Sequence, residues 1–444
     1  MINKKRVKFI DLFAGLGGIR IGFEQALKDL GYSSKCVFTS EIKETAIKAY
    51  QYNFPNSVIS GDIVKIKTKD IPDFDFLLAG FPCQPFSSAG NRYGFSDTRG
   101  TLFFEIQRIL KEKNPKGFLL ENVEGIVTHD RKSPQDKIGN TLTTILHSLE
   151  NLGYIVSWNI LNAKDFGVPQ NRKRIYIVGN KKDKVSLDCF DEKNVILKDI
   201  LENGQPIINT PFTEKLLRHY SINDLYGKSI KDKRGGTNNI HSWDIGLKGE
   251  ISKQEKEVLN LILKERRKKK WAKEKNIEWM DGMPLTLKEI TFSIGNDLFQ
   301  RNDTINALLD NLVKKGYLKF EYPKKRVTKT TSDGKKIICR EYDTSQQKGY
   351  NIVSGKLSFP ISTILDPLSV APTIVATDAD KIAVIDGNGI RKLTRREGLR
   401  LFGYPEKYDL SFLEMKDIYD LLGNTVVIPV IKEVATKLIK KSLD

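Results

Sequence analysis

The sequence predicts an α/β fold with a doubly wound, Rossmann-like parallel sheet, followed by a second and smaller domain. In the first 180 residues, short apolar runs alternate with helix-like stretches, which is typical of parallel strands with helices on both faces. Beyond Asn180 the alternation stops, and the chain is polar and rich in lysine to about Asp380. The 444 residues also exceed one typical core, so we expect two domains.

The predicted strands and helices of the first domain follow one another in regular order. The first apolar run, 7–13, precedes an amphipathic stretch, 19–30, whose apolar residues recur at helical spacing. Ligands of such sheets bind beyond the carboxyl ends of the strands, so the residues after each strand are candidates for a site. The other predicted strands are 35–40, the short run 57–62, 73–80, 116–123, 154–162 and 174–180, and the other helices are 43–54, 101–113 and 140–153.

The second domain is predicted to contain three helices followed by a strand pair. The helical stretches are 252–275, 286–295 and 302–318, and two alternating segments, 319–327 and 335–343, follow them with a glycine-containing turn between. This order is typical of a winged helix. The predicted domains are 1–183 and 184–388, with a winged-helix-like insertion at 252–342, a hinge at 389–422 and a C-terminal helix at 423–444 that packs back on the first domain.

Composition is that of a globular protein, with 39% hydrophobic and 29% charged residues. The chain has neither eighteen consecutive apolar residues nor a signal-peptide cleavage site, so we expect a cytoplasmic protein with no membrane partner.

A net charge of +18 indicates a polyanionic partner such as nucleic acid, although a solvated lysine-rich surface gives the same charge. Four cysteines without a CxxC pair predict no disulfide framework and no metal site.

A glycine-rich turn, DLFAGLGG at 11–18, follows the first predicted strand. Its glycines, Gly15, Gly17 and Gly18, allow a ligand to approach the backbone closely. Arg20 stands where a dinucleotide fingerprint needs its third glycine, so a pyrophosphate ligand is not favoured.

A nucleoside cofactor without a pyrophosphate needs such a turn, an aromatic face and carboxylates for its hydroxyl and amino groups. Phe13 lies in the turn, Glu41 follows the second predicted strand, and Asp62 follows the run 57–62. Each acid alone is also typical of a helix cap or a solvated charge. Together, at successive strand ends, they favour S-adenosyl-L-methionine.

A cysteine and a carboxylate follow the next two predicted strands. Strand 73–80 leads directly to Cys83, and strand 116–123 ends around Glu121, so both are expected to face one cleft. A free cysteine is most often a small buried hydrophobe, and a cysteine beside a carboxylate is not the arrangement of a cysteine protease. Arg172 and Arg174 share a face at the start of the last strand, which in isolation is typical of an exposed basic edge.

Six sequence blocks occur in order along the chain: DLFAGLGG, GFPCQPFS, ENV, QNRKR, RKLTRREGLRLFGYP and LLGNTVV. Through them the sequence resembles the DNA cytosine carbon-5 methyltransferases, over roughly the first 180 and the last 55 residues. The segment between these parts resembles only the winged-helix pattern.

The resemblance implies catalytic roles for four residues. Cys83 would add as a thiolate to carbon 6 of cytosine, and Glu121 would assist protonation of ring nitrogen 3. Arg174, supported by Arg172, would hold the base and lower the pKa of the thiol. The target base must first be flipped out of the duplex stack into the site.

The resemblance also implies contacts with DNA and with the cofactor. The segment 88–100 resembles the family's mobile loop over the flipped base, and Asn424 matches a residue that supports the cofactor and the cysteine loop. The implied DNA contacts are Gln84, Ser87, Arg99 and Thr373. The predicted cofactor contacts are Phe13, Ala14, Gly15, Leu16, Gly17, Gly18, Glu41, Ile42, Asp62, Ile63, Pro82, Asn424 and Val426.

The leading hypothesis is a monomeric, sequence-specific methyltransferase of double-stranded DNA, associated with the nucleoid when on DNA, with S-adenosyl-L-homocysteine as product. It would be the modification enzyme of a restriction–modification system, with a cognate endonuclease as functional partner.

Two alternatives are less consistent with the sequence. A transfer-RNA cytosine-5 methyltransferase shares the blocks but not the long lysine-rich domain. A non-catalytic winged-helix regulator has no need of Cys83, Glu121 and Arg174 together. Whether the insertion reads bases, binds phosphates or is scaffolding stays open.

Overall fold

A computed structural model describes residues 6–82, 102–133, 135–278, 282–294, 302–330, 336–354 and 359–443. The chain divides into two compact units, Met1–Glu202 with Asp366–Asp380 and Leu393–Asp444, and Asn203–Leu365 with Lys381–Lys392. The first unit therefore extends past the predicted boundary at 183, and it also includes 366–380. Backbone hydrogen bonds from the N–H of Leu197 to the carbonyl of Ser369 (2.9 Å) and from Lys198 to Pro367 (2.8 Å) explain this difference.

The first unit is built on a doubly wound sheet, as predicted. Its strands are β1 (Arg6–Leu12), β2 (Ser33–Ser40), β3 (Phe76–Gly80), β4 (Gly117–Val123), β5 (Ile155–Asn162) and β6 (Lys173–Asn180). They lie in the order β2-β1-β3-β4-β6-β5. The first four strands are parallel, but β6 is antiparallel to both β4 and β5, contrary to the all-parallel expectation. Only a short connection without a crossover helix joins β5 to β6, and this permits antiparallel pairing alone.

The predicted strand at 57–62 is a connecting segment. It makes one isolated bridge, between Thr39 and Ile59, and the side chain of Val58 is 81% exposed. Because its apolar residues do not reach the core, nothing holds the segment as a further strand of the sheet. Asp62 instead caps a short 3₁₀ helix, Ile63–Lys65.

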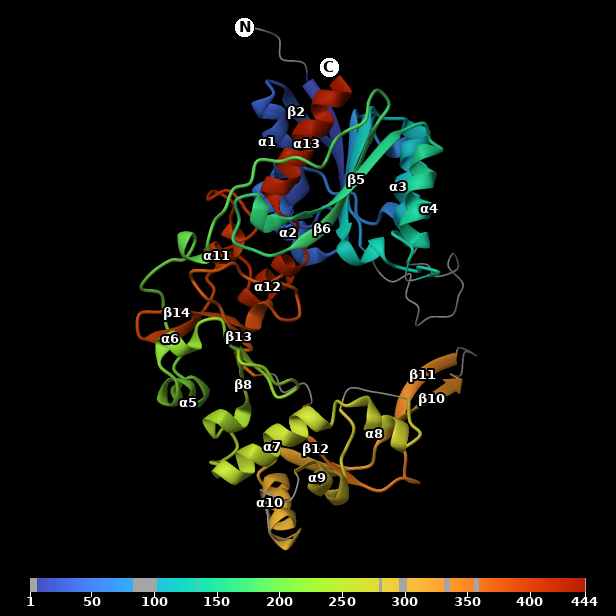
Figure 1. Ribbon diagram of the computed structural model, residues 1–444. Coiled ribbons are helices and arrows are strands. Elements are labelled where there is room, and N and C mark those ends of the chain that lie inside the picture. Colours follow the sequence, from blue (N-terminus) through green and yellow to red (C-terminus); the bar gives the residue numbers. More distant parts are fainter. Residues whose placement is uncertain are drawn as a thin grey trace. The chain divides into compact units, whose positions relative to one another are not determined.

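Helices cover both faces of this sheet (Figure 1). α3 (Leu102–Lys113) and α4 (Asn140–Glu150) pack their apolar residues against one face, whereas α1 (Gly18–Asp29) and α13 (Ile428–Leu443) lie side by side against the other. At Gly22 a Cβ atom would lie 2.7 Å from Cγ2 of Ile431, so glycine permits the close contact of α1 with α13. The described part of this unit also contains the α-helices α2 (Glu44–Asn53), α11 (Arg395–Arg400) and α12 (Met415–Gly423).

The second unit contains a small sheet in the order β15-β14-β13-β7-β8. Apolar residues of its strands form a separate core with Leu216 of α5 and Leu225 of α6. The predicted hinge residues 389–392 are its edge strand. The elements are α5 (Pro211–His219), α6 (Ile222–Leu225), β7 (Ser229–Ile230), β8 (Asn239–Ile240), β13 (Thr363–Ile364), β14 (Ile382–Asp386) and β15 (Gly389–Lys392).

The same unit contains the predicted helices, packed around a third core that includes Trp243 and Leu259, and the predicted strand pair. The single helix predicted at 252–275 is two helices, because the carbonyl of Arg266 accepts from the N–H of Met283 (2.9 Å) instead of continuing the helix. Pro323, which has no N–H, separates two strands where one was predicted. The winged helix stays a prediction. The elements are α7 (Lys253–Glu265), α8 (Lys269–Glu274), α9 (Leu287–Ile294), α10 (Asn302–Lys314), β9 (Leu318–Glu321), β10 (Lys324–Thr330), β11 (Lys336–Tyr342) and β12 (Gly349–Ile352).

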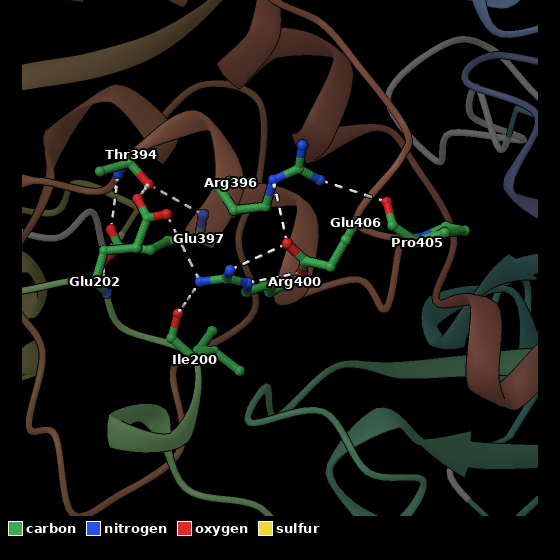
Figure 2. Close-up of polar contacts among 8 residues, drawn as sticks. All are labelled: Ile200, Glu202, Thr394, Arg396, Glu397, Arg400, Pro405 and Glu406. Carbon is green, nitrogen blue, oxygen red and sulfur yellow. Dashed lines mark hydrogen bonds and ion pairs between the residues drawn. The ribbon is translucent and has the colours of Figure 1, made fainter.

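A polar cluster joins the end of the first segment of the first unit, at Glu202, to the start of its last segment, at Leu393 (Figure 2). The buried carboxylate of Glu397 accepts from the backbone N–H of Glu202 and of Thr394, at 2.7 Å each. The hydroxyl of Thr394 donates to the carboxylate of Glu202 at 2.6 Å. Arg400 pairs with Glu406 at 2.9 Å on the exposed side of the cluster. Glu397 is therefore the buried acceptor that holds these two segment ends together.

Replacement of Glu397 by alanine is expected to loosen this junction. The two backbone donors would lose their partner, which typically costs about 1–3 kcal/mol for a buried hydrogen-bonded charge. Hydrogen–deuterium exchange should therefore become faster at the amides of Glu202 and Thr394. Glu406→Ala is the matched control, because that carboxylate is 65% exposed and an exposed ion pair contributes at most about 1 kcal/mol. Equal exchange in both variants would contradict the assigned role.

Candidate active site

A cavity of about 500 Å³ lies at the carboxyl ends of the parallel strands of the first unit. The chain passes from β1 to β2 on one side and on to β3 on the other, so the strand order reverses between β1 and β3, where doubly wound folds bind ligands. The volume suits a small-molecule ligand. The cavity is lined by Phe13, Gly15, Leu16, Ser40, Glu41, Ile42, Lys43, Ala46, Asp62, Ile63, Gly80, Phe81, Pro82, Leu102, Glu121, Asn122, Val123, Arg172, Arg174, Leu421, Gly423, Asn424 and Thr425.

The glycine-rich turn has a cavity-facing part and a packing part. Phe13 and Gly15 have φ angles of +55° and +53°, and a Cβ atom at Gly15 would meet no atom within 4 Å. Phe13 thus holds the strained left-handed conformation that non-glycine residues rarely adopt outside functional sites. At Gly17, with φ of +73°, a Cβ atom would lie only 2.6 Å from the ring of Phe54. Gly15 therefore leaves room for a ligand, whereas Gly17 leaves room for a neighbouring side chain.

Three further predicted cofactor contacts, Ala14, Gly18 and Val426, lie behind the cavity wall. A Cβ atom at Gly18 would lie 2.8 Å from Cγ2 of Val426, so this pair packs α1 against the segment before α13. Ala14 donates its backbone N–H to the carbonyl of Ser40 at 3.1 Å and joins the ends of β1 and β2. Neither these residues nor Gly17 line the cavity, and they position those that do.

The two acids predicted for a nucleoside both lie on the cavity wall. Oε2 of Glu41 accepts from the N–H of Gly15 at 2.8 Å, and Oε1 accepts from Ile42 (2.8 Å) and Lys43 (2.9 Å). Oδ1 of Asp62 accepts from the N–H of Val64 in its own short helix at 3.1 Å, and Oδ2 lies 3.9 Å from Nζ of Lys65. Ile42 also lines the cavity, and 70% of its surface is exposed. The wall thus presents carboxylate acceptors beside an apolar platform.

Glu121 and Arg174 form a buried ion pair at another part of the wall. The antiparallel register of β4 and β6 places Val123 opposite Arg174, and Nε of Arg174 lies 3.3 Å from Oε1 of Glu121. Burial raises the pKa of Glu121 above its ordinary value, and the positive charges of Arg174 and Arg172 act in the opposite direction. The carboxyl therefore retains its proton to a higher pH than an exposed glutamate, as a proton donor requires.

Arg172 has a different environment from Arg174, although the two share a face and both border the cavity. Its buried guanidinium donates to the backbone carbonyls of Ile374 (2.8 Å), Thr425 (2.8 Å) and Gly423 (3.3 Å). Burial, with the nearby charge of Arg174, lowers the pKa of Arg172 to about 10. Arg172 thus holds two distant segments of the first unit beside the cavity.

Several residues of the site were not predicted, and Asn122 is the most informative. Its Nδ2 donates to the carbonyl of Phe81 at 3.1 Å, and its Oδ1 accepts from the N–H of Val123 at 2.8 Å. Asn122 therefore joins the end of β4 to the segment directly before Pro82. Its position next to Glu121 in the ENV block was the only signal in the sequence that Asn122 belongs to the site. Leu421, Gly423 and Thr425 reach the cavity only through tertiary packing.

Four predicted site residues, Cys83, Gln84, Ser87 and Arg99, lie outside the described residues, as does the segment 88–100. Thr373, predicted to contact DNA, belongs to the first unit, and its hydroxyl donates to the carbonyl of Asn171 at 2.7 Å. Asn424 lines the cavity, and its Nδ2 donates to the carbonyl of Asp420 at 2.9 Å.

The sheet and the cavity at its switch point define a doubly wound α/β protein with a ligand site at the strand ends. The structure is similar to that of the S. pombe Dnmt2 methyltransferase, with a TM-score of 0.53 and 17% identity over 98% of this chain and 99% of that one. The chain belongs to the family of C-5 cytosine-specific DNA methylases, whose family model matches residues 7–440. It is therefore a DNA cytosine methyltransferase, of a family that depends on S-adenosyl-L-methionine in general.

Relatives match nearly the whole chain. It is 57% identical to "Type II methyltransferase M.NlaIV" of Neisseria lactamica, over 98% of this chain and 99% of the relative. It is 40% identical to "Type II methyltransferase M.BanI" of Aneurinibacillus aneurinilyticus, over 99% and 97% of the two chains. Among the described helices, none combines the length and the apolar character needed to cross a membrane.

Proposed function

We propose that this protein methylates carbon 5 of a flipped cytosine within a specific sequence of double-stranded DNA, through a covalent bond between Cys83 and carbon 6. The observation that supports this most directly is the buried Glu121–Arg174 pair on the cavity wall, which Asn122 joins to the segment leading to Cys83. This arrangement supports the proposal, because the carboxyl group of Glu121 follows the same strand as Asn122, which contacts the segment before Pro82.

The proposed step at the base uses Cys83 and Glu121. The Cys83 thiolate forms a bond to carbon 6, the displaced ring electrons move to nitrogen 3, and nitrogen 3 takes the proton of Glu121. Arg174 then holds the carboxylate of Glu121 in place after its proton has been transferred. After carbon 5 has been methylated, its proton leaves to solvent, the bond between carbon 6 and sulfur breaks, and the sulfur departs as thiolate. Glu121 then regains its proton from nitrogen 3.

The cavity residues fit S-adenosyl-L-methionine. Gly15 leaves open space, Ile42 offers an apolar surface, and Glu41 and Asp62 present acceptors for the hydroxyl and amino groups of an adenosine. When bound, S-adenosyl-L-methionine supplies the methyl group that carbon 5 receives, and S-adenosyl-L-homocysteine is the product.

Removal of either acid is expected to weaken cofactor binding. Glu41→Ala and Asp62→Ala should each reduce the affinity for S-adenosyl-L-methionine by about 1–3 kcal/mol, the range for a hydrogen bond to a charged group. Glu41→Ala should have the larger effect, because it also releases the N–H of Gly15. Isothermal titration calorimetry measures both affinities. Glu44→Ala, at an exposed position outside the cavity, should leave the affinity unchanged, and normal affinity in both test variants would refute the assignment.

We further propose that the enzyme protects DNA as part of a restriction–modification system. Relatives over almost the full length are named Type II methyltransferases, which supports this role. In this role it would act as a monomer, associate with the nucleoid when on DNA, and have a cognate endonuclease as a functional partner.

Bisulfite sequencing of a plasmid treated with the purified protein and S-adenosyl-L-methionine tests the activity. We expect protected cytosines in one recurring sequence on the duplex. Methylation of transfer RNA with none on the plasmid would contradict the proposal and favour a transfer-RNA methyltransferase. Thr373, Gln84, Ser87 and Arg99 stay candidate DNA contacts, to be tested by alanine variants in the same assay.

A further inference from the structure

The β10–β11 hairpin of the second unit is a two-stranded ribbon that pairs with no other described strand. Its seven register pairs run from Lys324–Tyr342 to Thr330–Lys336. Directly opposed residues of an antiparallel pair share a face, and successive residues alternate between faces. The ribbon therefore has two faces whose composition can be compared.

One face, here called the paired face, has its charges neutralised within the hairpin region. Lys325 forms an ion pair with Asp343 at 3.1 Å, and Lys329 forms one with Glu341. Val327 and Cys339 lie opposite each other between these ion pairs. This face needs no partner to balance its charge.

The other face, here called the basic face, has Lys324, Arg326 and Thr328 opposite Tyr342, Arg340 and Ile338. Arg326 and Arg340 stand directly opposite each other, an arrangement of like charges that destabilises a strand pair. Ile338 is 64% exposed, which adds uncovered apolar surface.

Acidic groups near the basic face do not balance its charge. Glu278 accepts from Arg326 at 2.7 Å, and Glu321, beside Tyr342, pairs with Lys319 at 2.8 Å. Among the described residues Arg340 has no acidic partner. Lys324 lies over the ring of Tyr342, 4.7 Å from its centre, and this contact contributes no opposite charge.

We propose that the basic face of the β10–β11 hairpin binds the phosphate backbone of double-stranded DNA. The proposal rests on the proposed function, which makes DNA the substrate, and adds a contact surface in the insertion. Phosphates would relieve the repulsion between Arg326 and Arg340, and their displaced counterions would favour association. A two-stranded ribbon also has the width that the major groove admits, so its basic side chains can reach the phosphates along the groove.

Two double variants of the full-length protein distinguish an effect of the basic face on DNA binding from an effect of net charge alone. K324Q/R340Q removes two cations from the basic face, and K325Q/K329Q removes two from the paired face of the same hairpin. Binding is measured by fluorescence anisotropy with a labelled duplex of random sequence over a series of KCl concentrations. K324Q/R340Q should weaken binding by roughly tenfold per lost contact at about 0.1 M salt and reduce the slope of log Kd against log salt by about 2. K325Q/K329Q should change Kd less than twofold.

A third variant, E278Q, tests the same surface in the opposite direction. It removes the acid that partly neutralises Arg326, so DNA affinity should rise several-fold. Thermal melting of each variant verifies folding. Equal weakening in both double variants would mean that only net charge acts, and unchanged affinity in K324Q/R340Q would mean that the hairpin does not touch DNA; either result overturns the proposal.

Methyl transfer distinguishes failure of this proposal from failure of the proposed function. At saturating DNA, K324Q/R340Q should keep the rate of the unaltered enzyme, because the hairpin contributes nothing to the chemistry. If the hairpin proposal is wrong, the unaltered enzyme still methylates the plasmid. If the proposed function is wrong, the unaltered enzyme methylates no duplex DNA.

Discussion

Cys83→Ser is expected to abolish methyl transfer while folding and affinity for S-adenosyl-L-methionine are retained. A serine hydroxyl stays neutral near pH 7 and cannot add to carbon 6 as a thiolate does, so we expect a loss of roughly 10⁴-fold or more in rate. Transfer of a radiolabelled methyl group to plasmid DNA measures the rate. Cys189→Ser, at an exposed cysteine of the first unit, is the matched control and should be fully active.

Trapping gives an independent check on the same nucleophile. Fluorine at carbon 5 cannot leave as a cation, so DNA with 5-fluorocytosine at the target should remain attached to the enzyme. The complex should resist denaturation and should be absent for the Cys83→Ser variant. Near-normal turnover of that variant, or trapping without Cys83, would refute the covalent mechanism.

Glu121→Gln is expected to reduce the single-turnover rate by about 10²- to 10⁴-fold, the usual contribution of a general acid. Glutamine preserves the shape of the side chain and has no acidic proton to transfer to nitrogen 3. Glu124→Gln, three residues later and exposed, should leave the rate unchanged. A rate within a factor of a few of the normal value for Glu121→Gln would contradict the assigned role.

The pH dependence tests the same residue. Because burial raises the pKa of Glu121, its acid form persists above the usual range of a carboxyl group and is lost as the pH rises through the raised value. The part of the rate that depends on Glu121 should therefore fall with rising pH in the normal enzyme, whereas Glu121→Gln should lack this decline. Single-turnover rates over a pH series, compared for the two proteins, measure the difference.

The strand-end residues of the site were predictable because they follow local signals. Phe13, Glu41 and Glu121 each lie at or just after an apolar run, and in a parallel sheet the carboxyl ends of neighbouring strands meet at one edge. The same logic was less accurate at 57–62, where an apolar run without neighbours to bury it did not become a strand.

The alternation of strands and helices, the glycine-rich turn and the acids around the cavity were predictable from the sequence alone, because periodicity and strand-end position are properties of short segments. Long-range packing places Gly15 at the cavity and Gly17 against Phe54. It also pairs Arg174 with Glu121 and directs Arg172 to backbone carbonyls. These differences depend on which distant residues are packed against each side chain. The spacing of Arg172 and Arg174 in the sequence does not reveal which of them contacts a carboxylate and which contacts backbone carbonyls. Their different partners follow from burial and long-range contacts.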